Sequence, residues 1–343
     1  MTVTVTKPQA TLRELLATLK KKTGLFGEQV MRSNTVDDFY NAKGSNRNLI
    51  INGDFRISQR GDYTTAANLP SSTYTLDRWI SYMSNMTGTL QHTTVTFNGE
   101  TRRAAKVVLT NSTSGEALLE QRVEPVNMIV GKTYTLSTWV RTTNSSIRLR
   151  VHDGASWITG AASQYASPSG QWQKITFTYL YNGPIAGYHP VQMYCTSGNT
   201  GEYYEFTDFQ LEEGTVATPF ERRLIGQELQ LCQRYCQVLG GASTNEIMSS
   251  GSGNVSNVST QVYKPCVPFR TIPTLAYSAL GHFEIQAVGT NVYTPTVISL
   301  ISSISSTQYI YIDINHTSGG TTGAVQLLRA ANTNARLTFS AEL

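Results

Sequence analysis

The chain has 343 residues, enough for two domains of ordinary size and an extension. Its net charge of +4 lies in residues 1–47, which hold eight of the 27 Lys and Arg residues and four of the 23 Asp and Glu residues. The remaining 19 basic and 19 acidic residues balance each other, so the rest of the chain is neutral. A neutral body argues against nucleic acid as the main ligand. The basic arm could still contact a nucleic acid or an acidic protein, but we favour solvated helix ends. We find no signal-like apolar core and no run near 18 apolar residues, and therefore expect no membrane insertion.

Residues 1–47 are predicted to form an arm outside the globular body. Within the arm, "TLRELLATLKKKTG" (11–24) predicts a short amphipathic helix, because Thr11 and Glu14 make a capping box and Gly24 can end it. Two or three turns are unstable alone, so the apolar face must dock on the body, on a symmetry mate or on another protein. We expect this face to attach the chain through Leu12, Leu15, Leu16 and Leu19.

From residue 48 to residue 220 the pattern changes to short apolar or alternating runs separated by Gly, Asn, Ser and Pro. Runs such as "TYTLSTWVRT" and "WQKITFTYLY", with no helical pattern between them, predict an antiparallel β-sandwich of the jelly-roll type. The run "NLIINGDF" (48–55) is expected to be its first strand, and Asn52-Gly53 permits a bend or bulge there.

Residues 221–239, "ERRLIGQELQLCQRYCQVL", predict a connecting helix with an apolar face. This helix can pack between two domains or self-associate, and we favour a trimer axis through Leu224, Leu231 and Tyr235. The nearby Cys232 and Cys236 are expected to be free thiols, with a disulfide or a metal site as the alternatives. Residues 240–343 return to β character and predict a second, smaller sandwich at the distal end. The fold class is therefore mainly β.

The order of several motifs from residue 48 onward resembles a known group of domains. "NLIINGDF", "LDRW", "GKTYTLSTWVR", "GQWQKITFTY" and "FTDFQLEEGTVATPFERR" look like the carbohydrate-binding-module-like jelly roll of glycan-active enzymes and phage virion proteins. The later "ELQLCQRYCQ", "PFRTIPTL" and "FSAEL" are similar to phage tail-fibre and tail-associated proteins. The resemblance implies a virion fibre or receptor-binding component, usually trimeric, that recognises a host-surface glycan or protein.

The same resemblance implies a structural calcium ion, which many members hold between carboxylates of the first and last strands. Those members have Gly-x-Phe-Glu in the first strand, whereas here Phe55 is followed by Arg56. Asp208 is the surviving candidate ligand. The departure puts the calcium in doubt and leaves open whether Arg56 replaces the ion with a salt bridge to Asp208. No other cofactor is expected.

Catalytic signatures are weak along the chain. The five histidines are scattered, no GxSxG or HExxH motif occurs, and Glu202 and Asp208 would stand about 20 Å apart on one regular strand. Glycan hydrolysis needs two carboxyl groups within about 5 to 9.5 Å. We therefore expect no enzymatic activity, with cross-strand carboxyl pairs as the open alternative.

Sugar binding fits the composition better, because sugar rings stack on aromatic side chains. Trp157 lies in a glycine-containing segment that offers no obvious strand, and with Asp153 and Tyr165 it would form a sugar platform; packing of Trp157 against its own sheet or a trimer neighbour is the alternative. Tyr181 and Tyr188 flank "NGPIAG" and could line an adjacent groove or merely anchor the loop.

The combined expectation is a structural phage virion protein, assembled in the host cytoplasm and located in the virion. It would be a homotrimeric tail fibre or receptor-binding component that contacts another virion protein through its arm and a host-surface glycan or protein. Two alternatives remain: a head or baseplate decoration protein with a purely structural jelly roll, and a polysaccharide-degrading accessory protein.

Overall fold

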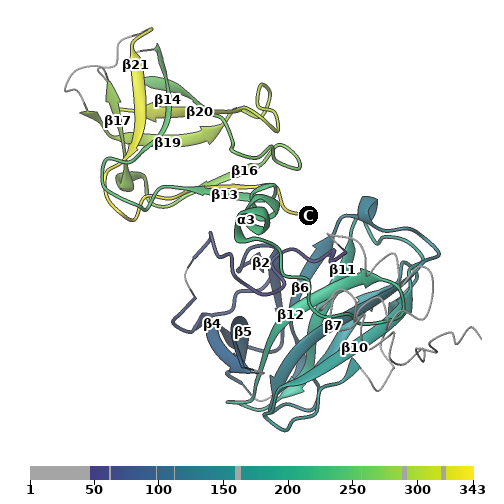
Figure 1. Ribbon diagram of the computed structural model, residues 1–343. Helices are drawn as coiled ribbons and strands as arrows, with labels where there is room; N and C mark the ends of the chain where they lie inside the picture. The colour runs from purple at the N-terminus through teal and green to yellow at the C-terminus, as the bar shows by residue number, and fades with distance from the viewer. Residues whose placement is uncertain are drawn as a thin grey trace, which may run out of the picture.

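The computed structural model describes residues 47–343 except 62, 98, 112, 159–163, 256, 288–291 and 318–321. These residues form two β units joined by a short helix (Figure 1). The predicted helix at 11–24 and its four leucines lie outside the described residues. Among the helices that are described, none has the length and apolar character needed to cross a membrane.

The larger unit consists of two six-stranded sheets in which every pairing is antiparallel. The first sheet has the order β1-β4-β5-β12-β7-β10, with bounds Ala67–Asn68, Gly88–Phe97, Glu100–Leu109, Tyr203–Glu213, Thr133–Thr142 and Gln173–Leu180. The second has the order β2-β3-β6-β11-β8-β9, with bounds Thr73–Tyr74, Trp79–Ser84, Thr113–Val123, His189–Gly198, Arg148–His152 and Trp157–Ile158. A 3-10 helix, η1 (Pro125–Asn127), follows β6.

Alternation along the strands divides each sheet into an inner and an outer face. In β8, Leu149 and Val151 are buried in the core between the sheets, while Arg148 and Arg150 take the other face. The centre of the core is an aromatic cluster in which Trp79 packs against Phe55, Phe206 and Phe209 at centroid distances of 5.1 to 5.6 Å. The sandwich of jelly-roll type predicted from the sequence agrees with this arrangement.

The segment at 48–57 is not the strand that we expected. It is irregular, although Ile50 and Phe55 are fully buried, and it follows β12 through hydrogen bonds from Leu49 N to Leu211 O (2.8 Å) and from Phe209 N to Gly53 O (2.9 Å). The expected bend is present, because Asn52 has a φ of 58°. A Cβ atom on Gly53 would lie 2.1 Å from the carbonyl oxygen of Phe209, so only glycine permits this close contact.

The connecting helix is shorter than predicted. Helix α3 spans Ile225–Gln233, and Cys236–Leu239 form strand β13 instead of the last helical turn. Pairing of β13 with β22 outweighs the helical pattern there, a tertiary effect that local periodicity cannot reveal. Cys232 and Cys236 are buried free thiols, as expected.

The side chains proposed for a trimer axis lie in different environments. Leu224 is 81% exposed, Leu231 is half-buried, and Tyr235 is buried beneath the guanidinium of Arg78, whose Cζ lies 3.5 Å from the ring centroid. Of the three, Leu224 alone is largely exposed, and its neighbour Ile225 is 53% exposed.

The second unit is the smaller β body that the sequence predicted, beginning at β13. A three-stranded sheet has the order β13-β22-β16, where β22 is Leu337–Ser340 and β16 is Thr274–Tyr277. A seven-stranded sheet has the order β18-β17-β21-β14-β15-β20-β19, with bounds Val292–Tyr293, Phe283–Ala287, Val325–Ala330, Ile247–Val255, Val258–Tyr263, Ile310–His316 and Pro295–Leu300. A 3-10 helix, η3 (Leu280–His282), precedes β17, and one apolar core joins the two sheets.

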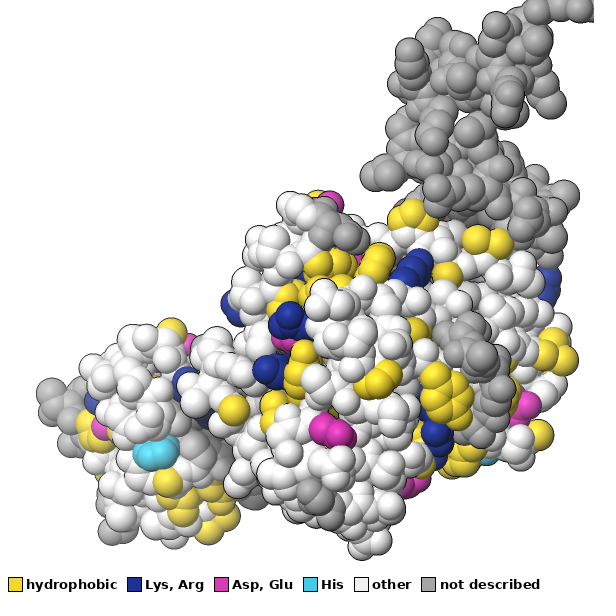
Figure 2. All heavy atoms as spheres, turned by 90° about the horizontal axis from the view of Figure 1, so that it is seen from below, with side chains coloured by type: hydrophobic (Ala, Val, Ile, Leu, Met, Phe, Trp, Pro, Cys, Tyr) yellow, Lys and Arg dark blue, Asp and Glu magenta, His cyan; other side chains and the backbone are white. Residues whose placement is uncertain are grey.

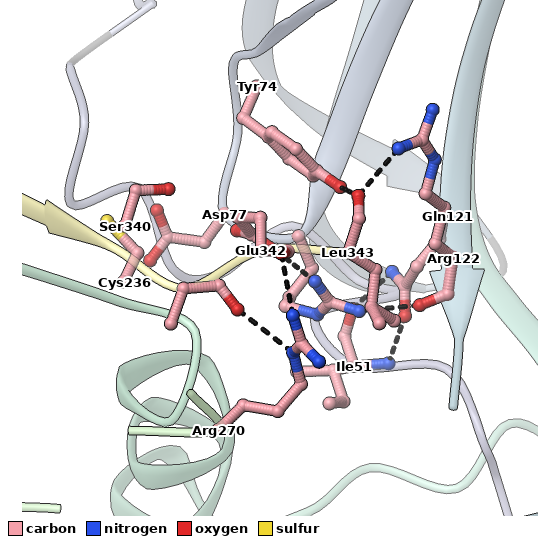
Figure 3. A network of polar contacts seen from close by, with 12 residues as sticks. Ile51, Tyr74, Asp77, Gln121, Arg122, Cys236, Arg270, Ser340, Glu342 and Leu343 are labelled. Atoms are coloured by element: carbon pink, nitrogen blue, oxygen red, sulfur yellow. Dashed lines mark hydrogen bonds and ion pairs between the residues drawn. The ribbon is translucent and has the colours of Figure 1, made fainter. Parts of the chain in front are cut away.

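The two units meet where the chain returns to the jelly roll after β22 (Figures 1 and 3). The carboxylate of Glu342 contacts the buried guanidinium of Arg78 and lies 3.0 Å from Nη2 of Arg60. The carbonyl oxygen of Leu343 accepts hydrogen bonds from Tyr74 OH (2.8 Å) and Arg122 Nη1 (2.6 Å). This junction fixes the second unit against the second sheet of the sandwich.

A buried histidine makes the stability of the larger unit depend on pH. His189 is fully buried, with its Nε2 atom 2.5 Å from the hydroxyl of Tyr179, and desolvation with a contribution from His152 lowers the pKa of His189 from 6.5 to about 3. Below pH 6.5 the imidazole of His189 becomes protonated in the unfolded chain, whereas in the folded chain it stays neutral down to about pH 3. Stability should then fall by about 1.4 kcal/mol per pH unit between pH 6.5 and pH 3.

We expect His189→Gln to remove this dependence. Urea unfolding at pH 7.0 and pH 4.5 should show a loss in the wild type that exceeds the loss in the variant by roughly 2.5 kcal/mol. Equal losses in the two proteins would show that His189 is protonated in the folded state.

Candidate functional site

A groove of about 320 Å³ lies on the outer face of the second sheet of the jelly roll. Neighbouring strands β3, β6, β11 and β8 supply its floor, and β9 supplies one wall. Outward positions of these strands alternate with core residues, so the sheet itself places most of the side chains. The groove is lined by Ser72, Ile80, Ser81, Tyr82, Glu116, Leu118, Glu120, Arg122, Arg150, Trp157 and Gln192.

Two partly exposed aromatic side chains stand at opposite sides of the groove. Trp157 and Tyr82 are each 39% exposed. Trp157 belongs to β9, where it pairs with His152, and its ring packs edge-on against that histidine at 5.2 Å. The guanidinium of Arg150 lies 4.3 Å from the indole centroid, so one side of Trp157 is supported by a cation and another face remains open.

The polar floor is a connected network. Arg150 Nε donates to Gln192 Oε1 (2.6 Å), Gln192 Nε2 donates to Glu120 Oε2 (2.5 Å), and Arg122 Nε donates to Glu120 Oε1 (2.8 Å). At one end of this network, Glu116 accepts hydrogen bonds from Arg150 Nη1 (3.2 Å) and from Tyr194 OH (2.7 Å). Because each side chain holds its neighbour, the donors and acceptors that face a ligand are fixed in advance.

This arrangement suits a hydroxyl-rich ligand with an apolar face. An indole ring packs against the C–H face of such a ligand, while amide and carboxylate groups bind its hydroxyls. Tyr82 and Arg148 are three strand spacings apart, about 14 Å, so the floor is broad enough for several ligand units. In the face shown in Figure 2, hydrophobic side chains of the larger unit form scattered patches beside basic ones.

The structure separates the five residues that were predicted to bind sugar. Trp157 lines the groove, and Tyr165 lies at the same edge of the sheet, 39% exposed, with its ring 5.2 Å from Arg148 Cζ. Tyr188 is half-buried and packs 4.5 Å from Arg122 Cζ, near the opposite end. Tyr181 is fully buried against Tyr134 and His189, so its predicted place in a groove is wrong. It continues the inward alternation of Phe177 and Tyr179.

Asp153 has a structural role in the loop that carries Trp157. Its Oδ1 atom accepts hydrogen bonds from the backbone amides of Ala155 and Ser156 (2.8 Å each), and Asn182 donates to Oδ2 (3.1 Å). Burial alone would raise the pKa of Asp153, but these hydrogen bonds lower it below its ordinary value. Asp153 therefore positions the tryptophan, and its carboxylate is already occupied by donors of the chain.

Most groove residues were missed from the sequence. Arg150, Gln192, Glu120 and Tyr82 lie inside strands whose intervening residues are buried in the core. A charged or amide side chain at an outward position of a central strand is a detectable signal. Which strands are neighbours, and so which of these side chains meet, depends on the non-local order β3-β6-β11-β8.

The residues around Asp208 do not fit a calcium ion. Asp208 forms an ion pair with Arg102, while Asp54 lies 2.5 Å from Arg56 Nε and 3.5 Å from Arg222 Nε. This answers the question that the sequence left open: Arg56 pairs with Asp54 and not with Asp208. Burial raises the pKa of Asp208, with Arg102 opposing that rise. Three guanidinium groups around two carboxylates repel a divalent cation, which needs excess negative charge.

We expect the thermal stability to be insensitive to calcium. A bound calcium ion, present at a hundred times its Kd, would add about 2.7 kcal/mol to the free energy of unfolding. We expect instead that adding calcium or EDTA changes the melting temperature by less than about 1 °C.

Arg102→Ala should destabilise the protein by about 2 kcal/mol because it leaves the buried Asp208 without its cation. A calcium-dependent rise in melting temperature of the wild type would refute this assignment. In the described part of the chain, no group of three or more His, Cys, Asp or Glu side chains could hold a metal ion.

A second hollow, of about 410 Å³, lies among loops at the end of β11 and is strongly polar. Its lining includes Asn144, Asn199 and Glu202. Asn144 Nδ2 donates to Glu202 Oε2 (2.6 Å), and Asn199 donates to Glu202 from its backbone and its amide (3.0 Å each). With its carboxylate occupied and no aromatic side chain in its lining, this hollow is a weaker candidate than the groove.

Comparison with known proteins identifies the class of the larger unit. Residues 47–215 match the family model described as "Carbohydrate binding domain", which covers just under half of the chain. These residues therefore form a carbohydrate-binding-module-like domain. No curated protein matches the sequence.

Several solved structures are similar to the chain at low identity. The CBM22-1 xylan-binding domain of Paenibacillus barcinonensis Xyn10C is 12% identical, with 46% of this chain and 99% of that chain covered and a TM-score of 0.30. TmCBM61 in complex with beta-1,4-galactotriose is 15% identical (49% and 99% covered, TM-score 0.30). The enzymatically active domain of bacteriophage CBA120 tailspike protein 4 is 11% identical (49% and 22% covered, TM-score 0.34). At these values we base no conclusion about ligand or activity on the similarities.

Proposed function

We propose that this chain is a glycan-binding attachment protein that holds a sugar chain in the groove of its jelly roll. The observation that carries the proposal is the pairing of an open aromatic face, Trp157, with the preorganised polar floor around Gln192 and Glu120. The match of the surrounding domain to a carbohydrate-binding family supports it.

We propose that binding is not accompanied by cleavage. The two groove glutamates, Glu116 and Glu120, are four residues apart on one strand, which places their Cα atoms about 13 Å apart. Glycosidases place their two carboxyl groups within about 5 to 9.5 Å. Both groups also accept hydrogen bonds from arginine side chains of the groove, so part of each carboxylate is already occupied within the protein.

The biological setting that we propose is a phage virion, with this chain as a trimeric tail fibre or receptor-binding component. The order of motifs along the sequence supports this setting. Residues 1–47 would attach the chain to another virion protein, Leu224 would contribute to contacts between copies, and the second unit would form the distal tip. The competing proposals are a decoration protein with a non-binding jelly roll and a polysaccharide-degrading accessory protein.

An array of bacterial surface glycans tests the binding function. We expect the purified chain to retain at least one glycan and to release no new reducing ends from it. Absence of binding would favour the decoration protein, and new reducing ends would favour the degrading enzyme. Imaging of particles that carry labelled chain, with and without residues 1–47, tests the virion setting: loss of the label without the arm is the expected result.

A further inference from the structure

The groove continues into a ladder of stacked rings and guanidinium groups along its β8 edge. Arg150 Cζ lies 4.3 Å from the Trp157 ring and 3.4 Å from the Tyr194 ring. Arg148 Cζ follows at 4.9 Å from Tyr194 and 5.2 Å from Tyr165. The order is therefore Trp157, Arg150, Tyr194, Arg148 and Tyr165, from the groove wall to the edge of the sheet.

The arginines near the groove differ in their pairing with carboxylates. Arg150 lies 3.2 Å from Glu116 and Arg122 lies 2.8 Å from Glu120, so both charges are neutralised inside the protein. Within the described residues, Arg148 makes no ion pair, and its buried Nε atom has no hydrogen-bond acceptor. Arg148 is thus a cation held between two tyrosine rings, with hydrogen-bonding capacity left over.

We propose that Arg148 recognises an acidic group on the bound glycan, so that the protein prefers anionic over neutral sugars. This inference rests on the glycan-binding function proposed above and adds the class of sugar. A guanidinium carries a planar fork of donors that matches a carboxylate with two parallel hydrogen bonds. Stacking on Tyr165 and Tyr194 fixes the plane of that fork before the ligand arrives, which reduces the entropy lost on binding.

The position of Arg148 also fits a chain that lies across the sheet. Arg148 is directly opposite Tyr194 on β11, which is opposite Leu118 on β6, and Leu118 is opposite Tyr82 on β3. A glycan along this row would pass over the apolar floor at Leu118 and end with its acidic group at Arg148. Trp157 lies off this row, opposite His152 and two outward positions beyond Arg148 along β8, where a further unit of the glycan would stack.

The test compares matched acidic and neutral polysaccharides. Polygalacturonate, alginate and hyaluronate are placed on an array beside their carboxyl-reduced forms, a phosphate-bearing teichoic acid and neutral bacterial surface glycans. We expect acidic glycans to bind about tenfold to a hundredfold more tightly than their reduced forms, the effect of one charge-assisted contact. A preference for the teichoic acid would identify phosphate as the anion.

Variants assign this preference to Arg148. Arg148→Gln should lose most of the advantage of the acidic glycans, and Arg148→Lys should retain only part of it because a lysine lacks the planar fork. Arg103→Gln, which removes the same charge from an exposed position on the other sheet, should bind like the wild type.

The outcomes separate the two proposals. Binding of neutral and acidic forms with equal affinity, or an unchanged preference in Arg148→Gln, would overturn the role of Arg148 and leave glycan binding intact. A chain that binds no glycan on the array would overturn the glycan-binding function itself, and the role of Arg148 with it.

Discussion

Trp157→Ala should weaken glycan binding by about 30- to 150-fold, which corresponds to roughly 2 to 3 kcal/mol. The indole is the largest apolar surface exposed in the groove, and its removal leaves the polar floor without the ring on which a sugar would stack. Because the side chain is 39% exposed, the fold should lose little stability. Titration calorimetry with a glycan retained on the array measures the change.

A matched control is available in the second unit. Tyr309 is 45% exposed, far from the groove in the sequence, and Tyr309→Ala should leave affinity unchanged. If Trp157→Ala binds as tightly as the wild type, the groove is not the binding site. If Tyr309→Ala loses as much affinity as Trp157→Ala, the distal unit takes part in binding and the jelly-roll groove is not sufficient.

Glu342→Ala should cost about 3 to 5 kcal/mol at the junction of the two units. The side chain of Glu342 is 5% exposed and that of its partner Arg78 is 1% exposed. Removal of the carboxylate leaves Arg78 buried without this countercharge, beside the Tyr235 ring and the carbonyl of Arg122. Such an uncompensated charge is among the most costly single changes in a protein.

Calorimetry should show the consequence as a change in cooperativity. In the wild type the two units should unfold together, because the contacts of Glu342 and Leu343 couple them. In Glu342→Ala the second unit should separate and unfold at a lower temperature. Glu100→Gln is the control: Glu100 also pairs with an arginine, but its side chain is 60% exposed and the change should cost less than about 1 kcal/mol. Equal effects of the two changes would refute the coupling.

The sheets were predictable from the sequence because alternation is a local signal. Leu149 and Val151 alternate with Arg148 and Arg150 in a way that any reader of the chain can detect, and the structure buries the first pair. The segment at 48–57 shows the limit of this signal. It alternates like a strand, but the bend at Asn52 and the contact of Gly53 with Phe209 hold it in an irregular path.

Two further errors have the same physical origin. The helical periodicity of 221–239 continues past Gln233, yet β22 pairs with Cys236–Leu239 and converts them to a strand. The sequence places Tyr181 in a loop close to a glycine. In the structure Tyr181 directly follows β10, and its side chain is buried in the core like those of Phe177 and Tyr179. In both cases partners from elsewhere in the chain decide the outcome.

The groove itself was half predictable. Trp157 was identified because a large aromatic side chain in a glycine-containing loop is unusual. Its neighbours Gln192 and Tyr82 were not, since they come from strands 35 and 75 residues away and meet only through the order of strands in the sheet. Periodicity predicts which face of a strand is outward, but it does not predict which strands lie side by side.

The central claim, that the groove of the jelly roll binds a glycan, is tested most directly by a crystal structure with a fragment of the retained glycan. We predict a sugar ring against the open face of Trp157, with its hydroxyls within hydrogen-bond distance of Gln192 or Glu120. A sugar bound instead in the polar hollow at Glu202, or on the second unit, would contradict the account.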